Sequence, residues 1–298
     1  YFGWRLARSG EEVIFVARGE NLRVLSERGL TVETPEGTSV VHPLHVVGEA
    51  KEAGHVDAIL LGVKAWQVPE AAEAIRPMLG RDTFVLPLQN GLEAPTHLVE
   101  ALGPERALGG LCHIVVFTVG PGHIRHAAIE PYIAFGELDN RPSERAQRLR
   151  EAFSKAGVKC EIPPDIHKAM WEKFLFIASF SGVAAVTRAP AGIVRSIPET
   201  RRMLEESMKE IVALATARGV NLKDDAINST MTFIDEMAPT ATASMQRDVM
   251  DSRPSELSEQ VGAVVRLGQE AGVETPLYSA IYGSLLPQEL RARGELVF

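Results

Sequence analysis

A single lysine heads an apolar stripe in the second half of the sequence. On a helix, Lys173 would share one face with Ile177, Phe180 and Ala184, and no other charge of this stretch follows it before Arg188. A lysine that is partly withdrawn from water has a lowered pKa and can donate a proton near neutral pH. The pattern indicates an acid catalyst. The alternative is a lysine that extends its amine to water from the start of a helix.

Two polar positions follow apolar runs of the kind found in buried parallel strands. Lys64 follows residues 58–63, and Asn90-Gly91 follows residues 84–88. Ligands of open α/β sheets bind at the carboxyl ends of the strands, and glycine allows close approach of the backbone. Together the two positions predict a binding site at this edge of a sheet, although Asn90-Gly91 taken alone fits a plain turn equally well.

Arg18-Gly19 follows another apolar run, residues 13–17. NAD sites usually carry an acidic residue at this strand end, whereas a guanidinium suits a 2′-phosphate. Arg18 therefore favours NADP, the alternative being an ordinary surface arginine. The usual G-x-G-x-x-G fingerprint is absent, because Gly120-Pro121-Gly122 is followed by Arg125 and lies far from the first helix. We expect the first strand and its glycine loop to precede Tyr1.

Other candidate residues carry a weaker signal. Glu256 follows Pro254 at an expected helix start, where the helix dipole favours an acid without any functional role. Ser244 is weaker still. The eight histidines show no metal-ligand spacing, so no metal site is predicted. Cys112 and Cys160 match no zinc or redox motif, which fits the reducing cytoplasm.

The elements that must position these residues change character near residue 164. Up to residue 162, strands alternate with helices, which predicts a parallel sheet covered on both faces. Within this part, Pro35-Glu36-Gly37 is expected to join residues 30–34 and 39–46 in a hairpin. After Pro163-Pro164 the sequence is almost entirely helical in pattern. We therefore expect an α/β domain over residues 1–164 and an all-α domain over residues 165–298.

Length, composition and charge limit the classes of function. The 298 residues are 45% hydrophobic and 23% charged, as in ordinary globular proteins of about two domains. Lys and Arg number 31 against 39 Asp and Glu, a net charge of −8, and no long basic run occurs, which argues against nucleic acid or an anionic membrane as partner. The longest apolar run, residues 174–186, is shorter than the roughly 20 residues of a membrane span and is expected to form a buried helix.

Six stretches of the sequence are informative by their order and spacing. They are Ala17-Arg18-Gly19, Val63-Lys64-Ala65-Trp66-Gln67, Leu88-Gln89-Asn90-Gly91-Leu92, Pro121-Gly122-His123-Ile124-Arg125-His126, Trp171-Glu172-Lys173-Phe174 and Gly272-Val273-Glu274-Thr275-Pro276. Through these stretches the chain resembles the ketopantoate reductase (2-dehydropantoate 2-reductase) family over nearly all its length.

The resemblance implies a Rossmann-like N-terminal domain, a helical C-terminal domain like that of 6-phosphogluconate dehydrogenase, NADPH in the cleft between them, and a homodimer. Lys173 corresponds to the catalytic lysine of the family, and Glu256 to the acid that contacts cofactor or substrate. By the same resemblance, Arg18 meets the 2′-phosphate. Lys64 and Asn90 lie near the nicotinamide half. The residues that then bind the small 2-oxo acid are Asn90, Lys173, Ser181 and Ser244.

The chain departs from the family pattern at three positions. The family usually has asparagines where this sequence has Ile177, Ser181 and Ala191. A site that depends on hydrogen bonds loses discrimination when its polar partners are replaced. The implied activity is NADPH-dependent reduction of ketopantoate to pantoate in pantothenate biosynthesis. Two alternatives stay open: a reductase for a more apolar 2-oxo acid, and a non-catalytic NADP-binding protein of the same fold.

Overall fold

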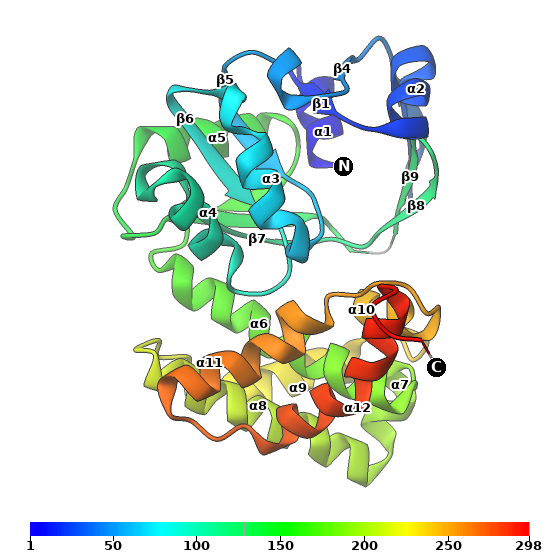
Figure 1. Ribbon diagram of the computed structural model, residues 1–298, viewed down its shortest axis with the longest axis vertical. Coiled ribbons are helices and arrows are strands. Elements are labelled where there is room, and N and C mark those ends of the chain that lie inside the picture. The colour runs from blue at the N-terminus through cyan, green and yellow to red at the C-terminus, as the bar shows by residue number, and fades with distance from the viewer. Residues whose placement is uncertain (128, 298) are drawn as a thin grey trace. The chain divides into compact units, whose positions relative to one another are not determined.

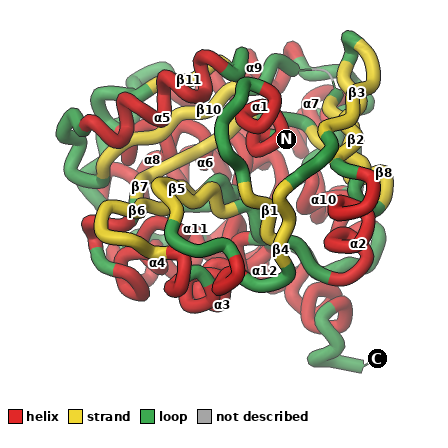
Figure 2. The backbone as a smooth tube through the Cα atoms, turned by 90° about the horizontal axis from the view of Figure 1, so that it is seen from above, coloured by secondary structure: helices red, strands yellow, loops and turns green. Residues whose placement is uncertain are grey.

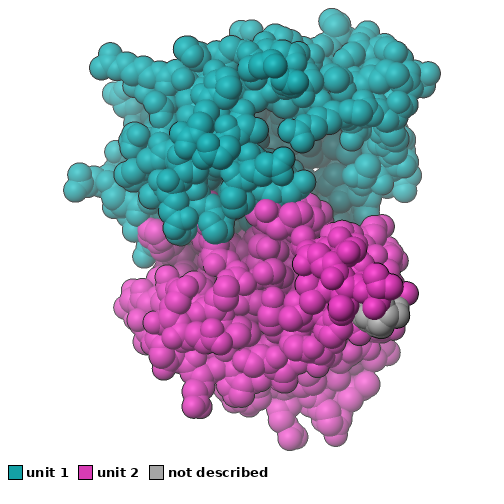
Figure 3. Space-filling model, in the orientation of Figure 1, with its two compact units in different colours: residues 1–63, 67–89, 95–166 teal, residues 64–66, 90–94, 167–298 magenta. Residues whose placement is uncertain are grey.

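The computed structural model describes residues 1–127 and 129–297, which form two compact units (Figure 3). The first unit consists of Tyr1–Val63, Gln67–Gln89 and Pro95–Ile166. The second consists of Lys64–Trp66, Asn90–Ala94 and His167–Phe298. Two short segments from the first third of the chain therefore pack with the C-terminal helices.

The first unit combines helices and strands (Figure 1). Its helices are α1 (Phe2–Arg8), α2 (Gly19–Arg28), α3 (Val68–Ala74), α4 (Ala94–Leu102) and α5 (Glu144–Lys155). Its strands, yellow in Figure 2, are β1 (Ile14–Val16), β2 (Leu30–Thr34), β3 (Gly37–Val41), β4 (His45–Val47), β5 (Val56–Leu61), β6 (Leu79–Pro87), β7 (Leu108–His113), β8 (Val116–Gly120), β9 (His123–His126), β10 (Tyr132–Glu137) and β11 (Lys159–Glu161). Local signals set several boundaries. Gly29 ends α2 at φ 78°, and the Ser143 side chain caps α5 by accepting a hydrogen bond from the Ala146 amide.

Parallel pairing dominates where helices separate the strands, and antiparallel pairing where only turns do. β1 pairs with β4, and β5 with β6, in parallel. β10 pairs in parallel with β11 and antiparallel with β7. β2 is flanked by β3, antiparallel, and by β9, parallel, and β8 completes that sheet. The predicted fold class, a Rossmann-like parallel-sheet domain followed by a helical one, is confirmed.

Two local expectations in this unit were wrong. The apolar run 13–17 was expected to form a buried strand, but the strand β1 within it is not buried and Val16 is 47% exposed. The second arm of the hairpin ends at Val41, and His45–Val47 forms the separate strand β4. Pro43 between them has no backbone N–H to continue a ladder.

The core of the first unit lies between its central strands and the helices α1 and α5. Leu86, Ile133, Phe135 and Phe153 are fully buried in one cluster. Burying a side chain of this size contributes roughly 1.5–3 kcal/mol. This packing holds the strands whose carboxyl ends lead into the candidate site.

The second unit is helical and is built around one long apolar helix. Its helices are α6 (Ile166–Thr187), α7 (Ala191–Ser196), α8 (Pro198–Ala217), α9 (Ala226–Glu236), α10 (Ser244–Met250), α11 (Ala263–Ala271) and α12 (Pro276–Ala292), with a π-helical segment, Ser258–Gly262, before α11. By length and composition α6 could cross a membrane, but 67% of its apolar stretch is buried inside the protein. The apolar stripe of α8 is fully buried and consists of Leu204, Met208, Ile211 and Ala215. Helix α6 therefore serves as a core helix, as the sequence predicted.

Candidate functional site

Three segments of the second unit meet at the carboxylate of Glu256. The Ala65 amide donates to its Oε1 at 3.2 Å, Asn90 Nδ2 donates to its Oε2 at 3.3 Å, and Gln260 Nε2 donates to its Oε2 at 3.0 Å. Glu256 is only 6% exposed, so these donors replace water around a buried acid. We call Ala65, Asn90, Glu256 and Gln260 the Glu256 cluster.

Two members of the cluster follow neighbouring strands in the sequence. Ala65 lies four residues after β5, and Asn90 lies three residues after β6. The two strands are paired in parallel, so their carboxyl ends lie at the same edge of the sheet. This arrangement brings two of the predicted site residues, Asn90 and Glu256, into direct contact.

Gly91 is required by the turn that presents Asn90. Its φ is +104°, a region that side chains with a Cβ rarely adopt. A Cβ on Gly91 would also lie 2.9 Å from the carbonyl oxygen of Glu259. Close packing of the backbone against the π-helical segment therefore fixes the path of the chain next to Asn90.

Lys64 is held by an acid of α10. Its Nζ lies 3.0 Å from Asp248 Oδ2 and 5.7 Å from the centre of the Trp66 ring. Asp248 also accepts hydrogen bonds from Arg253 at 3.0 and 3.2 Å. The Lys64 side chain is 44% exposed, so its ammonium combines an ion pair with access to solvent.

Lys173 lies in the third turn of α6 and is half-buried. Trp171 and Phe174 beside it are buried, and the helix face that was predicted to carry it is apolar, with Phe180 and Ala184 fully buried. Lys173 belongs to the same compact unit as the Glu256 cluster. Lys173 is therefore half-buried on a largely apolar helix face, and its role as an acid catalyst stays a prediction.

The two serines occupy different environments. Ser244 is the first residue of α10 and is half-buried, on the helix that also supplies Asp248. Ser181 is fully buried in α6, and its hydroxyl has no hydrogen-bond partner within the described part of the chain. Ser244 is thus accessible to a ligand, whereas Ser181 is enclosed by protein. The roles of both remain predictions.

Arg18 belongs to the first unit and immediately precedes α2, two residues after β1. Its side chain is exposed, and Gly19 next to it has φ +56° with open space where a Cβ would stand. An exposed guanidinium beside a backbone without a side chain leaves room for a phosphate group. Arg18 and Gly19 could therefore accommodate a phosphate group.

Gln89 is a structural link that sequence reasoning missed. It is buried, and its Nε2 donates to the carbonyl oxygens of Leu61 at 2.6 Å and Val63 at 3.0 Å. It therefore ties the end of β6 to the end of β5, just before Lys64 and Asn90. The available signal was a polar residue directly after an apolar strand and next to a candidate site residue.

Glu259 is a second acid that sequence reasoning missed. It lies in the π-helical segment, and such segments occur frequently at functional sites. Burial raises the pKa of its carboxyl to about 7, the Glu256 carboxylate raises it further, and Arg293 and Arg266 oppose the shift. Its Oε2 is enclosed without a hydrogen-bond partner among the described residues. No sequence pattern distinguishes a π-turn from an ordinary helix start, so this environment required the structure.

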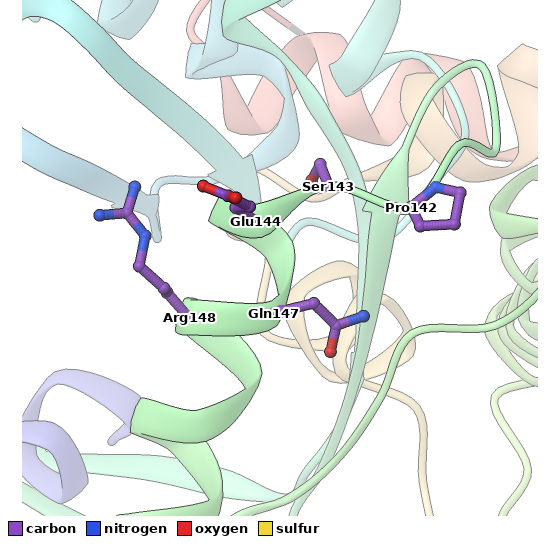
Figure 4. A pocket seen from close by; sticks show the side chains of 5 residues that line it. All are labelled: Pro142, Ser143, Glu144, Gln147 and Arg148. Atoms are coloured by element: carbon purple, nitrogen blue, oxygen red, sulfur yellow. The ribbon is translucent and has the colours of Figure 1, made fainter.

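A pocket at the start of α5 is lined by residues other than the predicted site residues (Figure 4). The side chains that line it are Pro142, Ser143, Glu144, Gln147 and Arg148. Ser143 is already used as a helix cap. Across residues 1–127 and 129–297, no group of three or more His, Cys, Asp or Glu side chains could hold a metal ion.

Comparison with known proteins places this chain beside one family. The family model described as "Ketopantoate reductase PanE/ApbA" matches residues 1–140, and the model of the family's C-terminal part matches residues 165–289. A 2-dehydropantoate 2-reductase from Nostoc sp. is 28% identical over 290 residues, which cover 96% of this chain and 90% of that protein.

Solved structures give the same grouping. The crystal structure of 2-dehydropantoate 2-reductase from Geobacter metallireducens GS-15 is similar with a TM-score of 0.90 and 28% identity, over 96% of this chain and 95% of that one. The ternary structure of D-mandelate dehydrogenase with NADH and anilino(oxo)acetate has a TM-score of 0.89 at 22% identity, over 98% of this chain and 95% of that one, a likeness of fold.

Proposed function

This chain belongs to the ketopantoate reductase family and is an oxidoreductase that acts on a CH–OH group, and we propose that it uses NADPH to reduce 2-dehydropantoate to pantoate in pantothenate biosynthesis. The Glu256 cluster carries the proposal. Its Asn90–Glu256 contact joins two residues that the family resemblance assigns to cofactor and substrate, although they lie 166 positions apart.

The residues proposed to bind the cofactor are Arg18, Lys64, Asn90 and Glu256. Arg18, exposed beside Gly19, is suited to grip the 2′-phosphate with charge-assisted hydrogen bonds. Asn90 and Lys64 would contact the nicotinamide half. Bound NADPH would supply the hydride that reduces the ketone carbon.

Lys173 would control the charge and the proton at the substrate oxygen. As the ketone is reduced, negative charge develops on the carbonyl oxygen, and a nearby ammonium stabilises it more strongly where water is partly excluded. Lys173 would then donate a proton to that oxygen, which completes the hydroxyl group, and regain one from solvent. Ser244 would contact the bound acid. Ser181, which the family resemblance also assigns to the substrate, is fully buried.

The proposed activity is tested by NADPH oxidation with a panel of 2-oxo acids. We expect the highest kcat/KM with 2-dehydropantoate. Lys173→Ala should lower kcat by about 10²–10⁴-fold, the usual contribution of positioned acid catalysis. Lys209→Ala, at an exposed ion pair on α8, is the control and should leave kcat unchanged. Unchanged turnover in Lys173→Ala would contradict the mechanism.

A second candidate substrate is a more apolar 2-oxo acid. Ile177 is half-buried and packs against the core of the second unit, and Ala191 is fully buried. Neither position offers the amide that the family usually has, so hydrogen bonding to a polar substrate side chain is reduced. Preference for a phenyl-substituted or branched aliphatic oxo acid in the same panel would favour this candidate. Binding of NADPH without turnover of any oxo acid would favour a non-catalytic protein.

The proposal also covers the cellular compartment, the binding partners and the oligomeric state of the enzyme. With two cysteines that match no redox motif and a net charge of −8, we propose a cytoplasmic enzyme whose partner is a small molecule, with neither nucleic acid nor a membrane as ligand. We propose a homodimer by family resemblance. Light scattering after size-exclusion chromatography would measure the mass in solution, and a monomer would overturn that part.

A further inference from the structure

A second buried acid, Glu289 of α12, is bonded to the residue that precedes Glu256. Glu289 is only 5% exposed. The Ser255 amide donates to its two oxygens at 3.0 and 3.1 Å, and Ser255 Oγ donates to its Oε2 at 2.5 Å. Ser255 Oγ also accepts a hydrogen bond from the Leu257 amide at 3.3 Å. Glu289 therefore fixes the backbone on both sides of Glu256.

Arg293 links the same acid to a different segment. Its Nε donates to Glu289 Oε1 at 2.7 Å, and its Nη2 donates to the Ser255 carbonyl at 2.9 Å. Its guanidinium lies 4.6 Å from the centre of the Trp66 ring, within the range of a cation–π contact. Trp66 directly follows Ala65, whose amide binds the Glu256 carboxylate.

These contacts form a closed ring inside the second unit. Its members, in order, are Glu256, Ala65, Trp66, Arg293, Glu289 and Ser255. In the ring, the side chain of Glu256 and its backbone are anchored independently, the first to the segment after β5 and the second to α12. Displacement of either anchor would move the carboxylate relative to that segment.

We propose that Glu289 is a positioning residue that acts through Ser255 and Arg293 to hold the Glu256 carboxylate against the segment Lys64–Trp66. The consequence for catalysis rests on the proposed function, in which Glu256 contacts cofactor or substrate. Supporting residues of this kind typically change activity by about 10–100-fold, because small displacements at a reacting site are costly. The competing explanation is that these contacts only stabilise the end of α12 and have no specific effect on Glu256.

Glu289→Gln tests the proposal because it keeps the shape of the side chain and removes its charge. We expect kcat/KM to fall by about 10–100-fold. In a Glu256→Gln background the same change should alter kcat/KM less than about 2-fold, since the residue through which Glu289 acts is already disabled. Glu270→Gln removes an exposed ion pair with Arg218 and is the control. It should leave kcat/KM unchanged both in the wild type and in the Glu256→Gln background. An equal loss in both backgrounds, or no loss in the single variant, would overturn the proposal.

A measurement without substrate or cofactor separates this proposal from the proposed function. Hydrogen exchange of the peptide that contains Ala65 and Trp66, followed by mass spectrometry on the native protein, should be faster in Glu289→Gln than in the wild type and in Glu270→Gln. An unchanged exchange rate would overturn the proposed positioning role of Glu289 even if the enzyme is active. If the wild type reduces no oxo acid, the proposed function fails, and the exchange result still shows whether Glu289 positions Glu256.

Arg293→Lys provides a second route if Glu289→Gln does not fold. It keeps a positive charge next to Glu289 but loses the planar guanidinium, which donates to the Ser255 carbonyl and makes the cation–π contact with Trp66. The same faster exchange and the same dependence on Glu256 are expected, and their absence would count equally against the proposal.

Discussion

Two acids three residues apart show how strongly the immediate surroundings decide what a residue can do. Glu256 is buried among three N–H donors, so its carboxylate has replacements for water. One oxygen of Glu259 is enclosed without such a partner among the residues that the structure describes, and burial raises the pKa of its carboxyl to about 7. The same residue type therefore serves as an anchored acceptor at one position and as a titrating group near neutral pH at the other.

Glu259 predicts a loss of stability as pH rises. Its pKa of about 7 in the folded protein lies above the ordinary value of 4.5, so the folded state holds the proton more tightly than the unfolded state does. The stability that Glu259 contributes is therefore present below about pH 4.5 and is lost as pH rises to about 7. Glu259→Gln should remove this contribution, and the difference in Tm between variant and wild type should grow across that interval.

Thermal unfolding at several pH values measures the effect. Gly62→Ala changes no titratable group and introduces a Cβ into open space, so it is the control and should differ from the wild type by the same amount at every pH. Parallel curves of Tm against pH for wild type and Glu259→Gln would show that Glu259 titrates alike in the folded and unfolded states.

Arg18 predicts the choice between the two nicotinamide cofactors. A charge-assisted hydrogen bond to a phosphate is worth about 1.5–3 kcal/mol, so Arg18→Ala should weaken NADPH binding by about 10–100-fold and NADH binding much less. Fluorescence titration with each cofactor measures both constants. Arg23→Ala is the control, because Arg23 lies in the helix that follows Arg18 and is engaged with Glu20 and Glu27. Equal weakening of both cofactors would argue against a 2′-phosphate site.

At the scale of elements, the turn after β6 is shaped by the π-helical segment before α11. Gly91 packs so closely on the carbonyl of Glu259 that no side chain fits, and its φ of +104° excludes most other residues. Asn90 can reach Glu256 because this turn brings the two backbones together. A change at Gly91 should therefore affect both stability and the site.

Gly91→Ala should lower the free energy of unfolding by about 1–3 kcal/mol, the cost of forcing a Cβ into such a conformation. Gly62→Ala is a matched control at the end of β5, because a Cβ there would meet nothing within 4 Å. Urea unfolding compares the two variants. A loss in Gly91→Ala no larger than in Gly62→Ala would mean that the turn can relax.

At the scale of the whole molecule, the division into units does not follow the order of the chain. Lys64–Trp66 and Asn90–Ala94 leave the α/β part and pack with the helices that begin at His167. The chain therefore passes back and forth between the units at the positions where ligand-binding residues are expected. Cofactor binding should influence the stability of the entire protein.

NADPH should raise the Tm of the intact chain. A ligand that binds only the folded state stabilises it by about 2.7 kcal/mol at 100 times its Kd. NADH at the same concentration should give a smaller shift, and Lys173→Ala should retain the NADPH shift because the lysine acts on the substrate. Calorimetry with and without each cofactor measures these differences. An unchanged Tm in saturating NADPH would contradict the proposed cofactor.

The sequence by itself determined the elements and much of their burial. Glycines mark the ends of helices at Gly29 and Gly272, and the apolar run of α6 is buried as predicted, because such signals act over a few residues. The sequence also identified Asn90 and Glu256 separately. Only the tertiary structure decided that they touch, since the bonds of Glu256 to Ala65 and Asn90 span 191 and 166 positions. The roles of Gln89, Glu259 and Glu289 arise in the same way, because burial and hydrogen-bond partners depend on segments that are distant in the chain.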